Sequence, residues 1–329
     1  MNTRIFGKTG RAVGEVGLGT WQIGGNWGDV SDETALTVLR TARELGTNFF
    51  DTADVYGSGR SESLIGRFLK ESGARDRLFV ATKLGRRGDP GWPENFTREV
   101  VRQHTEDSLR RLGIDAVDLT QLHCVPSEVL MRGELFGWLE ELKREGKIRA
   151  YGASVESMDE ALWCCQQPGC ASLQIIFSIF RQKPIDRLFA AARASGVALI
   201  VRLPLASGLL GGKMTQATSF PADDHRNFNR DGQAFNVGET FAGLPFAKGV
   251  ELADALKSHV PAGMTMAEMA LRWCLDFDAV SVIIPGAKNP AQVRANVQAG
   301  ALPPLGAAKH TALATFYRQQ VAAHIRGPY

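Results

Sequence analysis

The chain has 329 residues, of which 44% are hydrophobic and 22% charged, an ordinary composition for a globular protein. Its 38 Lys and Arg residues against 35 Asp and Glu residues leave a net charge of +3, which is too small and too evenly spread to indicate a nucleic-acid partner. The chain begins without an apolar signal core and lacks any run of about 18 apolar residues, so we expect a cytoplasmic protein with no membrane partner. Five cysteines without paired spacing indicate reduced thiols and no metal site.

A short hairpin is predicted first, with its turn at residues 7–10, followed by a strand at 16–19. Apolar runs then alternate with amphipathic segments, so the hydrophobic pattern switches repeatedly between the repeat of a strand and that of a helix. The further predicted strands lie at 48–51, 78–83, 117–123, 150–154, 172–177, 198–202 and 280–284. The predicted helices lie at 32–45, 61–69, 97–112, 135–145, 158–166, 184–195, 246–258, 266–275, 290–299 and 303–324.

Eight strand-helix repeats predict one α/β domain, residues 1–329, with the (β/α)8 TIM-barrel fold. The N-terminal β-hairpin would plug one end, and the extra C-terminal helix would pack outside the barrel. No Gly-x-Gly-x-x-Gly motif follows the first strand, which argues against an open dinucleotide-binding sheet. A long polar stretch at 211–245 interrupts the rhythm, and loops of that length are usually functional or disordered.

Four polar residues, Asp51, Tyr56, Lys83 and His123, stand at or just past the carboxyl ends of predicted strands. Because these ends meet at one face of a barrel, we expect the four to form a catalytic set. A free phenol has a pKa of about 10, so Tyr56 needs a nearby cation such as Lys83 to lower that pKa and make it an efficient proton donor. Asp51 would keep a buried Lys83 charged, and a neutral His123 would orient a carbonyl oxygen. Asp54, between them in sequence, is expected to be a turn or solvated residue.

Three sequence blocks carry these residues: DTADVYG at 51–57, ATK at 81–83 and QLH at 121–123. Together with LGTW at 18–21, GAS at 152–154, PLASGLLGGK at 204–213 and IPGAK at 284–288, they resemble the aldo-keto reductase family along nearly the whole chain. The resemblance implies an NADPH-dependent oxidoreductase that reduces an aldehyde or ketone, a small-molecule carbonyl substrate. It implies Tyr56 as general acid, His123 as orienting residue, and Lys83 and Asp51 as the pair that tunes the phenol. A monomer is the default for the family.

No side chain delivers a hydride, so the reaction requires a reduced nicotinamide. The resemblance places the nicotinamide carboxamide at Ser154 and Gln174, and the pyrophosphate at the backbone after the seventh strand. Lys288 would bind the 2′-phosphate and favour NADP(H) over NAD, with Arg294 as its rival. The full predicted cofactor set is Ser154, Gln174, Arg202, Pro204, Leu205, Ser207, Gly208, Leu209, Lys213, Gly286, Lys288, Gln292 and Asn296.

Arg202 departs from the family pattern, which usually has an aromatic residue that stacks on the nicotinamide at this position. A guanidinium can still stack on a ring, but it would be a like charge beside the oxidised nicotinamide. The sequence therefore predicts that Arg202 favours binding of the reduced cofactor. The competing interpretation is an arginine that turns away toward a carboxylate.

Trp21 and Trp27, after the first strand, are the predicted substrate-binding residues, with Trp92 or Phe228 from later loops. Two other functions stay open at this point. One is a cofactor-binding regulatory subunit with little turnover, as occurs among family members that serve as channel subunits. The other is a barrel isomerase or aldolase that uses Lys83 as a Schiff-base amine.

Overall fold

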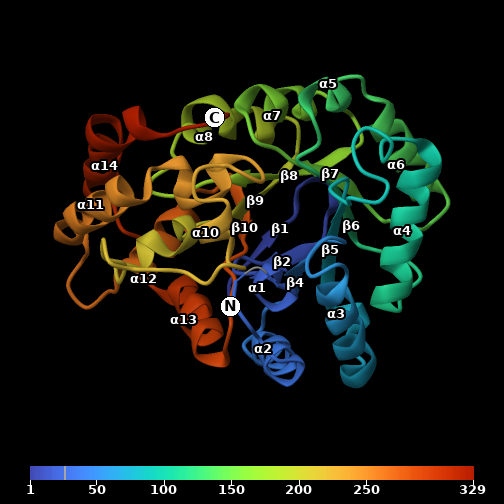
Figure 1. Ribbon diagram of the computed structural model, residues 1–329, viewed down its shortest axis with the longest axis horizontal. Helices are drawn as coiled ribbons and strands as arrows, with labels where there is room; N and C mark the ends of the chain where they lie inside the picture. Colours follow the sequence, from blue (N-terminus) through green and yellow to red (C-terminus); the bar gives the residue numbers. More distant parts are fainter. Residues whose placement is uncertain (26) are drawn as a thin grey trace.

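A computed structural model describes residues 1–25 and 27–329. In this part of the chain, eight parallel strands form a barrel in which neighbours follow the chain order (Figure 1). They are β3 (Leu18–Gly19), β4 (Phe49–Asp51), β5 (Phe79–Leu84), β6 (Leu119–His123), β7 (Tyr151–Ser154), β8 (Cys170–Ile176), β9 (Ala198–Arg202) and β10 (Val280–Ile283). Parallel bridges from Val16 to Ile283 and from Gly19 to Gly286 close the barrel. The predicted TIM barrel is confirmed.

The longer helices lie around the outside of the barrel, and short ones lie at its open face (Figure 1). They are α1 (Trp21–Gly24), α2 (Asp32–Glu44), α3 (Arg60–Ser72), α4 (Arg98–Leu112), α5 (Ser127–Leu130), α6 (Glu134–Arg144), α7 (Met158–Cys165), α8 (Pro184–Arg187), α9 (Phe189–Ala194), α10 (His225–Phe228), α11 (Phe246–Leu256), α12 (Met266–Leu275), α13 (Pro290–Ala301) and α14 (Ala307–Phe316). The predicted helix at 184–195 is two helices, with Leu188 between them. Among the residues described, no helix combines the length and apolarity needed to cross a membrane.

Helix ends lie where the sequence offers capping groups. Capping boxes begin two helices: Ser157 with Glu160 at α7, and Thr265 with Glu268 at α12. The long helix α4 ends at Gly113, whose φ of +64° is a left-handed conformation that glycine adopts without strain. These local signals agree with the hydrophobic pattern, which is why most boundaries predicted from the sequence are close to the observed ones.

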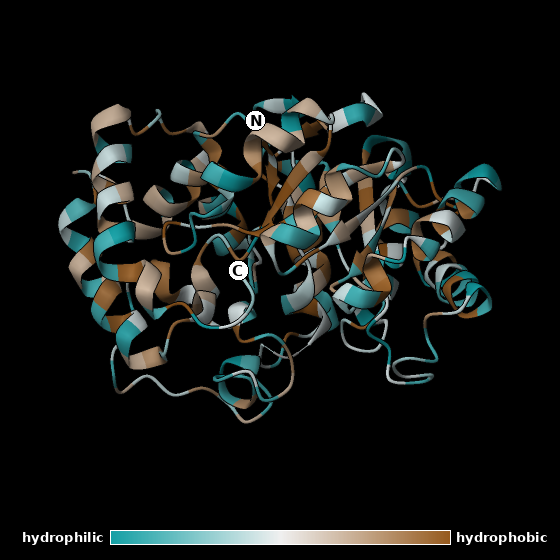
Figure 2. Cartoon of the chain, turned by 90° about the horizontal axis from the view of Figure 1, so that it is seen from above, coloured by the Kyte–Doolittle hydropathy of each residue, from teal (hydrophilic) through white to brown (hydrophobic). Residues whose placement is uncertain are grey.

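The hairpin, β1 (Thr3–Ile5) and β2 (Ala12–Gly14), covers the amino-terminal end of the barrel. Phe6 beside it is fully buried and packs against Phe49 and Phe79, with ring centroids 5.4 and 4.9 Å away. In Figure 2 the interior strands are brown and the outer helices carry most of the teal. The apolar floor closes one end of the barrel and leaves the carboxyl ends of the strands as the open face.

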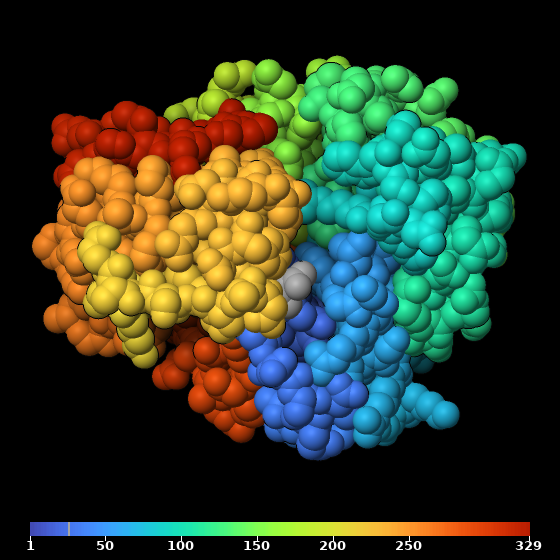
Figure 3. All heavy atoms as spheres, in the orientation of Figure 1, coloured from blue at the N-terminus to red at the C-terminus, as the bar shows by residue number. Residues whose placement is uncertain are grey.

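The polar stretch 211–245 is not a structureless loop. It contains α10 and two 3₁₀ turns, Val237–Glu239 and Phe241–Gly243. Figure 3 shows this segment, yellow to gold, bordering a hollow that faces the blue part of the chain. The C-terminal helix also differs from its predicted range. Helix α14 begins only after Gly306, because Pro303 and Pro304 precede it. It continues as a π-helical turn, Tyr317–Val321, and a 3₁₀ turn, Ala322–His324.

Candidate active site

The predicted tetrad residues meet at the open face of the barrel. The ammonium of Lys83 is fully buried and donates to Asp51 Oδ1 at 2.5 Å, to the Thr52 carbonyl at 2.8 Å and to Tyr56 Oη at 3.3 Å. These residues come from the ends of β4 and β5, which pair in parallel register. The ion pair thus places a cation directly beside the phenol, as the sequence predicts.

Burial changes how the cation acts on the phenol. Burial raises the pKa of Tyr56 above its ordinary value, while the Lys83 ammonium opposes this and lowers it only in part. The expected net lowering is therefore wrong, because the loss of water around the phenol outweighs the nearby charge. Burial alone would lower the pKa of Lys83, but Asp51 and Tyr56 together outweigh it and leave that pKa raised. At neutral pH Tyr56 is a protonated phenol and Lys83 is a cation.

His123 lies opposite the phenol, with its ring centroid 5.8 Å from that of Tyr56 and the two planes at 81°. Burial lowers the pKa of His123 well below its ordinary value, and the cations Arg86, Lys83 and Arg202 lower it further. The imidazole is therefore neutral at physiological pH. A neutral imidazole carries one N–H, so it can donate a hydrogen bond to a carbonyl oxygen without competing as an acid.

Asp51 is held by two amides as well as by Lys83. Gln121 and Gln174 donate to Asp51 Oδ2 at 3.1 and 2.8 Å. Sequence analysis missed the role of Gln121, although it lies in the block that carries His123. Gln174, predicted to bind the nicotinamide carboxamide, lines the cleft but already uses its amide nitrogen on Asp51. Its side-chain oxygen can still accept a hydrogen bond from the N–H of a carboxamide.

A cleft of about 740 Å³ opens above the tetrad. Most of the predicted site residues line it: Trp21, Trp27, Asp51, Tyr56, His123, Gln174, Arg202, Pro204, Leu205, Ser207, Gly208, Lys213, Gly286, Lys288, Gln292 and Asn296. Lys83, Ser154 and Leu209 do not line it. Lys83 lies below the lining and contacts it through Tyr56 Oη, whereas Ser154 Oγ accepts from Cys124 Sγ at 3.4 Å, and Leu209 is a fully buried core side chain.

Aromatic rings form the wall beside Tyr56. Trp21 is stacked on Tyr56, with centroids 5.8 Å apart and planes at 14°, and meets Trp27 edge-on at 5.6 Å. Phe235, from the segment 211–245, also lines the cleft and lies 6.1 Å from Trp21. The later-loop aromatic is thus Phe235, and neither Trp92 nor Phe228 is among the lining residues. The cleft lining next to Tyr56 is therefore flat and apolar.

The far end of the cleft is basic. Lys288 is half-buried, and its neighbours in the lining are Gln292, Asn296 and Arg226. Burial lowers the pKa of Lys288, and the guanidinium of Arg226 lowers it further. Arg294 is exposed on α13 and does not line the cleft. Arg226, which sequence analysis missed, lines this end instead, and its guanidinium also donates to the Asp224 carboxylate at 2.9 and 2.6 Å.

Arg202 forms an ion pair with a carboxylate. Its guanidinium lies 3.5 Å from Glu239 and donates to the Val155 carbonyl at 3.2 Å. Arg86 donates to the same Glu239 at 2.8 Å and to Glu156 at 3.1 Å. Burial would raise the pKa of Glu239, but Arg86 and Arg202 bring it to about 2, so this carboxylate is ionised. Arg202 thus faces the carboxylate of Glu239, as the competing interpretation of the sequence predicted, and its positive charge is largely compensated.

Comparison with known proteins identifies the family. The model of the aldo/keto reductase family matches residues 15–318. The chain belongs to that family. It is 31% identical to the NADH-specific methylglyoxal reductase of Escherichia coli over 317 residues, which cover 89% of this chain and 92% of that protein.

Solved aldo/keto reductase structures have the same fold. An aldo-keto reductase of Bacillus halodurans in its holo form superposes with a TM-score of 0.77 and 29% identity, over 96% of both chains. The glycerol dehydrogenase of Gluconobacter oxydans gives a TM-score of 0.77 and 29% identity, over 99% of this chain and 97% of that one. The family uses nicotinamide cofactors, and its members include enzymes that interconvert carbonyls and alcohols.

The cleft of this aldo/keto reductase fits such a cofactor. After β9 the backbone turns sharply through Ser207 and Gly208, with φ of +55° and +100°. The φ of +100° at Gly208 is a left-handed conformation that residues with a Cβ rarely adopt, so this turn favours glycine. From here the lining runs past Lys213 to Lys288. A pyrophosphate and a 2′-phosphate both require such cations. The Gly208 amide itself donates to the Leu205 carbonyl at 2.9 Å, so it is not free to bind phosphate as the sequence suggested.

Asp54 lies in a turn, as expected, but it is buried and not solvated. Only 2% exposed, it pairs with Arg87 Nε at 2.9 Å, and Arg87 also donates to Asp107 at 2.6 Å. His104 Nδ1 lies 4.0 Å from the same carboxylate. Burial raises the pKa of Asp54 to about 7, against the lowering effect of Arg87. The turn that carries Tyr56 therefore contains a buried carboxyl group with a pKa of about 7.

Asp54→Asn is expected to change how stability depends on pH. In the folded protein the pKa of Asp54 is about 7, whereas in an unfolded chain it is near the ordinary value of 3.8. Between these two pH values the unfolded state therefore binds fewer protons than the folded state, so the contribution of Asp54 to the free energy of unfolding falls as pH rises. The variant has no such proton. We expect the free energy of unfolding of the variant minus that of wild type to increase by a few kcal/mol from pH 5 to pH 8. Urea unfolding at the two pH values measures this difference.

The matched control is Asp278→Asn, whose side chain is 81% exposed and pairs only with Arg193 among the residues described. Its difference from wild type should be the same at both pH values. A difference for Asp54→Asn that does not change with pH would refute a neutral-range titration at this site.

Proposed function

We propose that the protein reduces an aldehyde or ketone to the alcohol with NADPH, and that Tyr56 is the general acid. The observation that carries the proposal is the hydrogen bond from Lys83 to the phenol, in a cleft whose other wall holds a neutral His123. A protonated phenol beside a cation is suited to giving its proton to an alkoxide and remaining as a stabilised phenolate. No other described residue in the cleft combines these properties.

The reaction begins with the carbonyl against the aromatic wall. Its oxygen accepts hydrogen bonds from Tyr56 Oη and from His123, which polarises the carbonyl and fixes its orientation. The bound nicotinamide supplies the hydride. As negative charge develops on the oxygen, Tyr56 transfers its proton, and Lys83 stabilises the phenolate that remains. Asp51 keeps Lys83 protonated, and Gln121 and Gln174 hold Asp51 in place.

The environment of Lys83 argues against an aldolase that would use it as a Schiff-base amine. A nucleophilic amine must be neutral, but Asp51 and Tyr56 together raise the pKa of Lys83 above its ordinary value in spite of burial. The intact set of four residues argues against a purely regulatory subunit with little turnover. The decisive measurement follows NADPH absorbance with a panel of aldehydes. NADPH that binds but is not consumed would favour the regulatory function. If NADPH neither binds nor is consumed, both the reductase and the regulatory function are rejected.

The cofactor preference and substrate class follow from the two ends of the cleft. Lys288 and Arg226 favour the 2′-phosphate of NADPH, although one relative is named as NADH-specific. Flat rings beside Tyr56 and a polar rim of Arg86 and Glu239 suit a small carbonyl compound with further oxygen atoms. Relatives named for methylglyoxal and glycerol support that class. Such compounds belong first in the screen.

Opposite changes in charge near the nicotinamide should shift cofactor preference in opposite directions. Because Arg202 and Glu239 compensate each other, Arg202→Tyr should leave a net negative charge and improve binding of the oxidised relative to the reduced cofactor. Glu239→Gln should leave a net positive charge and do the reverse, each by about five-fold, which corresponds to about 1 kcal/mol. Fluorescence titration of both cofactors measures the ratio.

The control for these two variants is Glu251→Gln, a 65% exposed carboxylate on α11, which should leave the ratio unchanged. Melting temperatures identify any variant that is misfolded. If Arg202→Tyr and Glu239→Gln shift the ratio in the same direction, charge compensation at the nicotinamide is the wrong explanation.

A further inference from the structure

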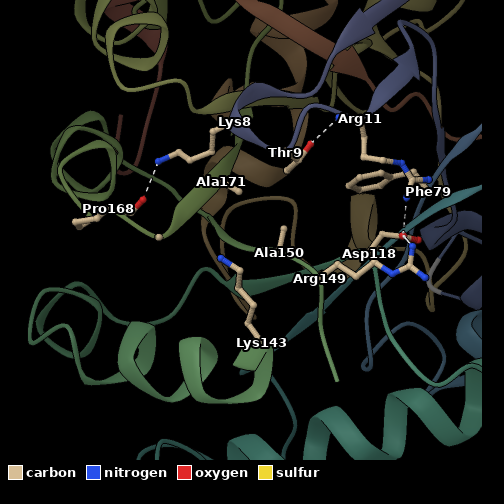
Figure 4. Close-up of a pocket in the computed structure, with 11 residues that line it drawn as sticks. Lys8, Thr9, Arg11, Phe79, Asp118, Lys143, Arg149, Ala150, Pro168 and Ala171 are labelled. Carbon is tan, nitrogen blue, oxygen red and sulfur yellow. Dashed lines mark hydrogen bonds and ion pairs between the residues drawn. The ribbon is translucent and has the colours of Figure 1, made fainter. Parts of the chain in front are cut away.

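A second cavity, of about 400 Å³, lies at the amino-terminal end of the barrel, far from the tetrad (Figure 4). Its floor is the beginning of the barrel strands: Phe79 starts β5, Ala150 precedes β7 and Ala171 lies at the start of β8. The turn of the N-terminal hairpin and α6 provide the sides. The cavity shares no residue with the cofactor cleft.

The polar lining is mainly cationic. It contains Lys8, Arg11, Lys143 and Arg149 against one carboxylate, Asp118. Figure 4 shows the two lysines on one side of the cavity, from the hairpin turn and from α6, and the two arginines on the other side around Asp118.

Asp118 cannot neutralise these cations. Its side chain is 1% exposed, and Oδ2 already accepts from Arg75 at 2.7 Å and from the Val80 amide at 2.9 Å. The guanidiniums of Arg11 and Arg149 lie at 3.5 and 3.4 Å from Oδ1, both longer than the contact with Arg75. One negative charge is thus shared by three guanidiniums, so positive charge remains at the cavity.

The cations also keep unused donors. Within residues 1–25 and 27–329, the side chains of Arg149 and Lys143 donate no hydrogen bond, although Lys143 lies 3.8 Å from Glu140. Lys8 uses one donor, on the Pro168 carbonyl at 3.0 Å. The apolar floor behind them has a low dielectric constant, which strengthens the field of one-signed charges in a cleft. Cationic donors without acceptors in such a cavity favour an anionic ligand with several oxygen atoms.

We propose that this cavity binds a small molecule with two phosphate groups, one between Lys8 and Lys143 and the other against Arg11 and Arg149. The proposal does not depend on the reductase function, because the cavity lies at the other end of the barrel. A ligand here would contact the beginnings of the strands whose far ends carry Lys83 and His123.

Isothermal titration with inorganic pyrophosphate at constant ionic strength, with and without saturating NADPH, tests the proposal. Saturable one-to-one binding that persists with NADPH is expected. The double variant Lys143→Ala with Arg149→Ala should weaken it at least ten-fold, because it removes two cationic hydrogen-bond donors from the cavity. Both side chains are exposed, so the variant should fold, which its melting temperature checks.

The matched control removes the same charge elsewhere, as Lys70→Ala with Arg318→Ala, two exposed residues outside the cavity, and should bind as wild type does. Binding that NADPH abolishes would place pyrophosphate in the cofactor cleft and overturn the proposal. Equal weakening in both double variants would show a general charge effect and also overturn it, as would an absence of saturable binding.

Discussion

Tyr56→Phe is expected to lower kcat for carbonyl reduction by about 100- to 10,000-fold, the range over which a positioned proton donor accelerates a reaction. The substitution removes the hydroxyl that Lys83 contacts at 3.3 Å, and keeps the ring that stacks on Trp21. The dissociation constant of NADPH should change little, because the phenol lies at the substrate end. Steady-state kinetics with a good aldehyde and a fluorescence titration of NADPH measure the two quantities.

Tyr317→Phe is the matched control for this variant. It also removes a largely buried hydroxyl, which bonds Tyr329 Oη at 2.7 Å, but it lies outside the cleft. Its kcat should equal that of wild type. If Tyr56→Phe keeps wild-type kcat at saturating substrate, Tyr56 is not the general acid, and another group must protonate the alkoxide.

Lys288→Ala should weaken NADPH binding by about 10- to 100-fold, the loss expected for a charge-assisted hydrogen bond, and leave NADH binding nearly unchanged. The physical reason is that only NADPH carries the 2′-phosphate that needs a cation. Because Arg226 lines the same end of the cleft as Lys288, part of the preference should survive the substitution. The ratio of the two dissociation constants, measured by fluorescence titration, reports the effect.

Arg294→Ala discriminates between the two residues that the sequence offered for the phosphate. Arg294 is exposed on α13 outside the cleft, so its removal should leave both affinities as they are. A loss of NADPH affinity in Arg294→Ala with none in Lys288→Ala would reverse the assignment. Equal losses of NADPH and NADH affinity in Lys288→Ala would mean that the lysine does not recognise the 2′-phosphate.

The barrel was predictable because its signals repeat. Eight apolar runs alternate with amphipathic segments, and capping residues such as Ser157 and Thr265 mark where helices begin. The predicted tetrad followed from the same pattern, since the ends of parallel strands meet at one face. The short helix α10 was not predictable in this way, because four residues are too few to show a helical period.

The contacts around the tetrad were hidden for a different reason. Glu239 and Arg86 are 153 positions apart, and Gln174 and Asp51 are 123 apart, so nothing local in the sequence links them. The burial of Asp54 could not be predicted, because nothing in the sequence distinguishes a buried acid in a turn from a solvated one. The net effect on the pKa of Tyr56 was also beyond the sequence, because it depends on how completely the fold excludes water from the phenol.

The shared carboxylate of Glu239 sets a condition for building chimaeras of this enzyme. The segment 211–245 is the obvious unit to exchange when a new substrate range is wanted, since it carries Phe235 into the cleft. The barrel, however, contributes both Arg86 and Arg202, whose guanidiniums stay in place whatever segment is grafted. A donor segment without an acid at the position of Glu239 would leave Glu156 as the one carboxylate that the structure describes beside the two guanidiniums, so a graft designed by loop length and aromatic content alone should fail unless that acid is transferred too.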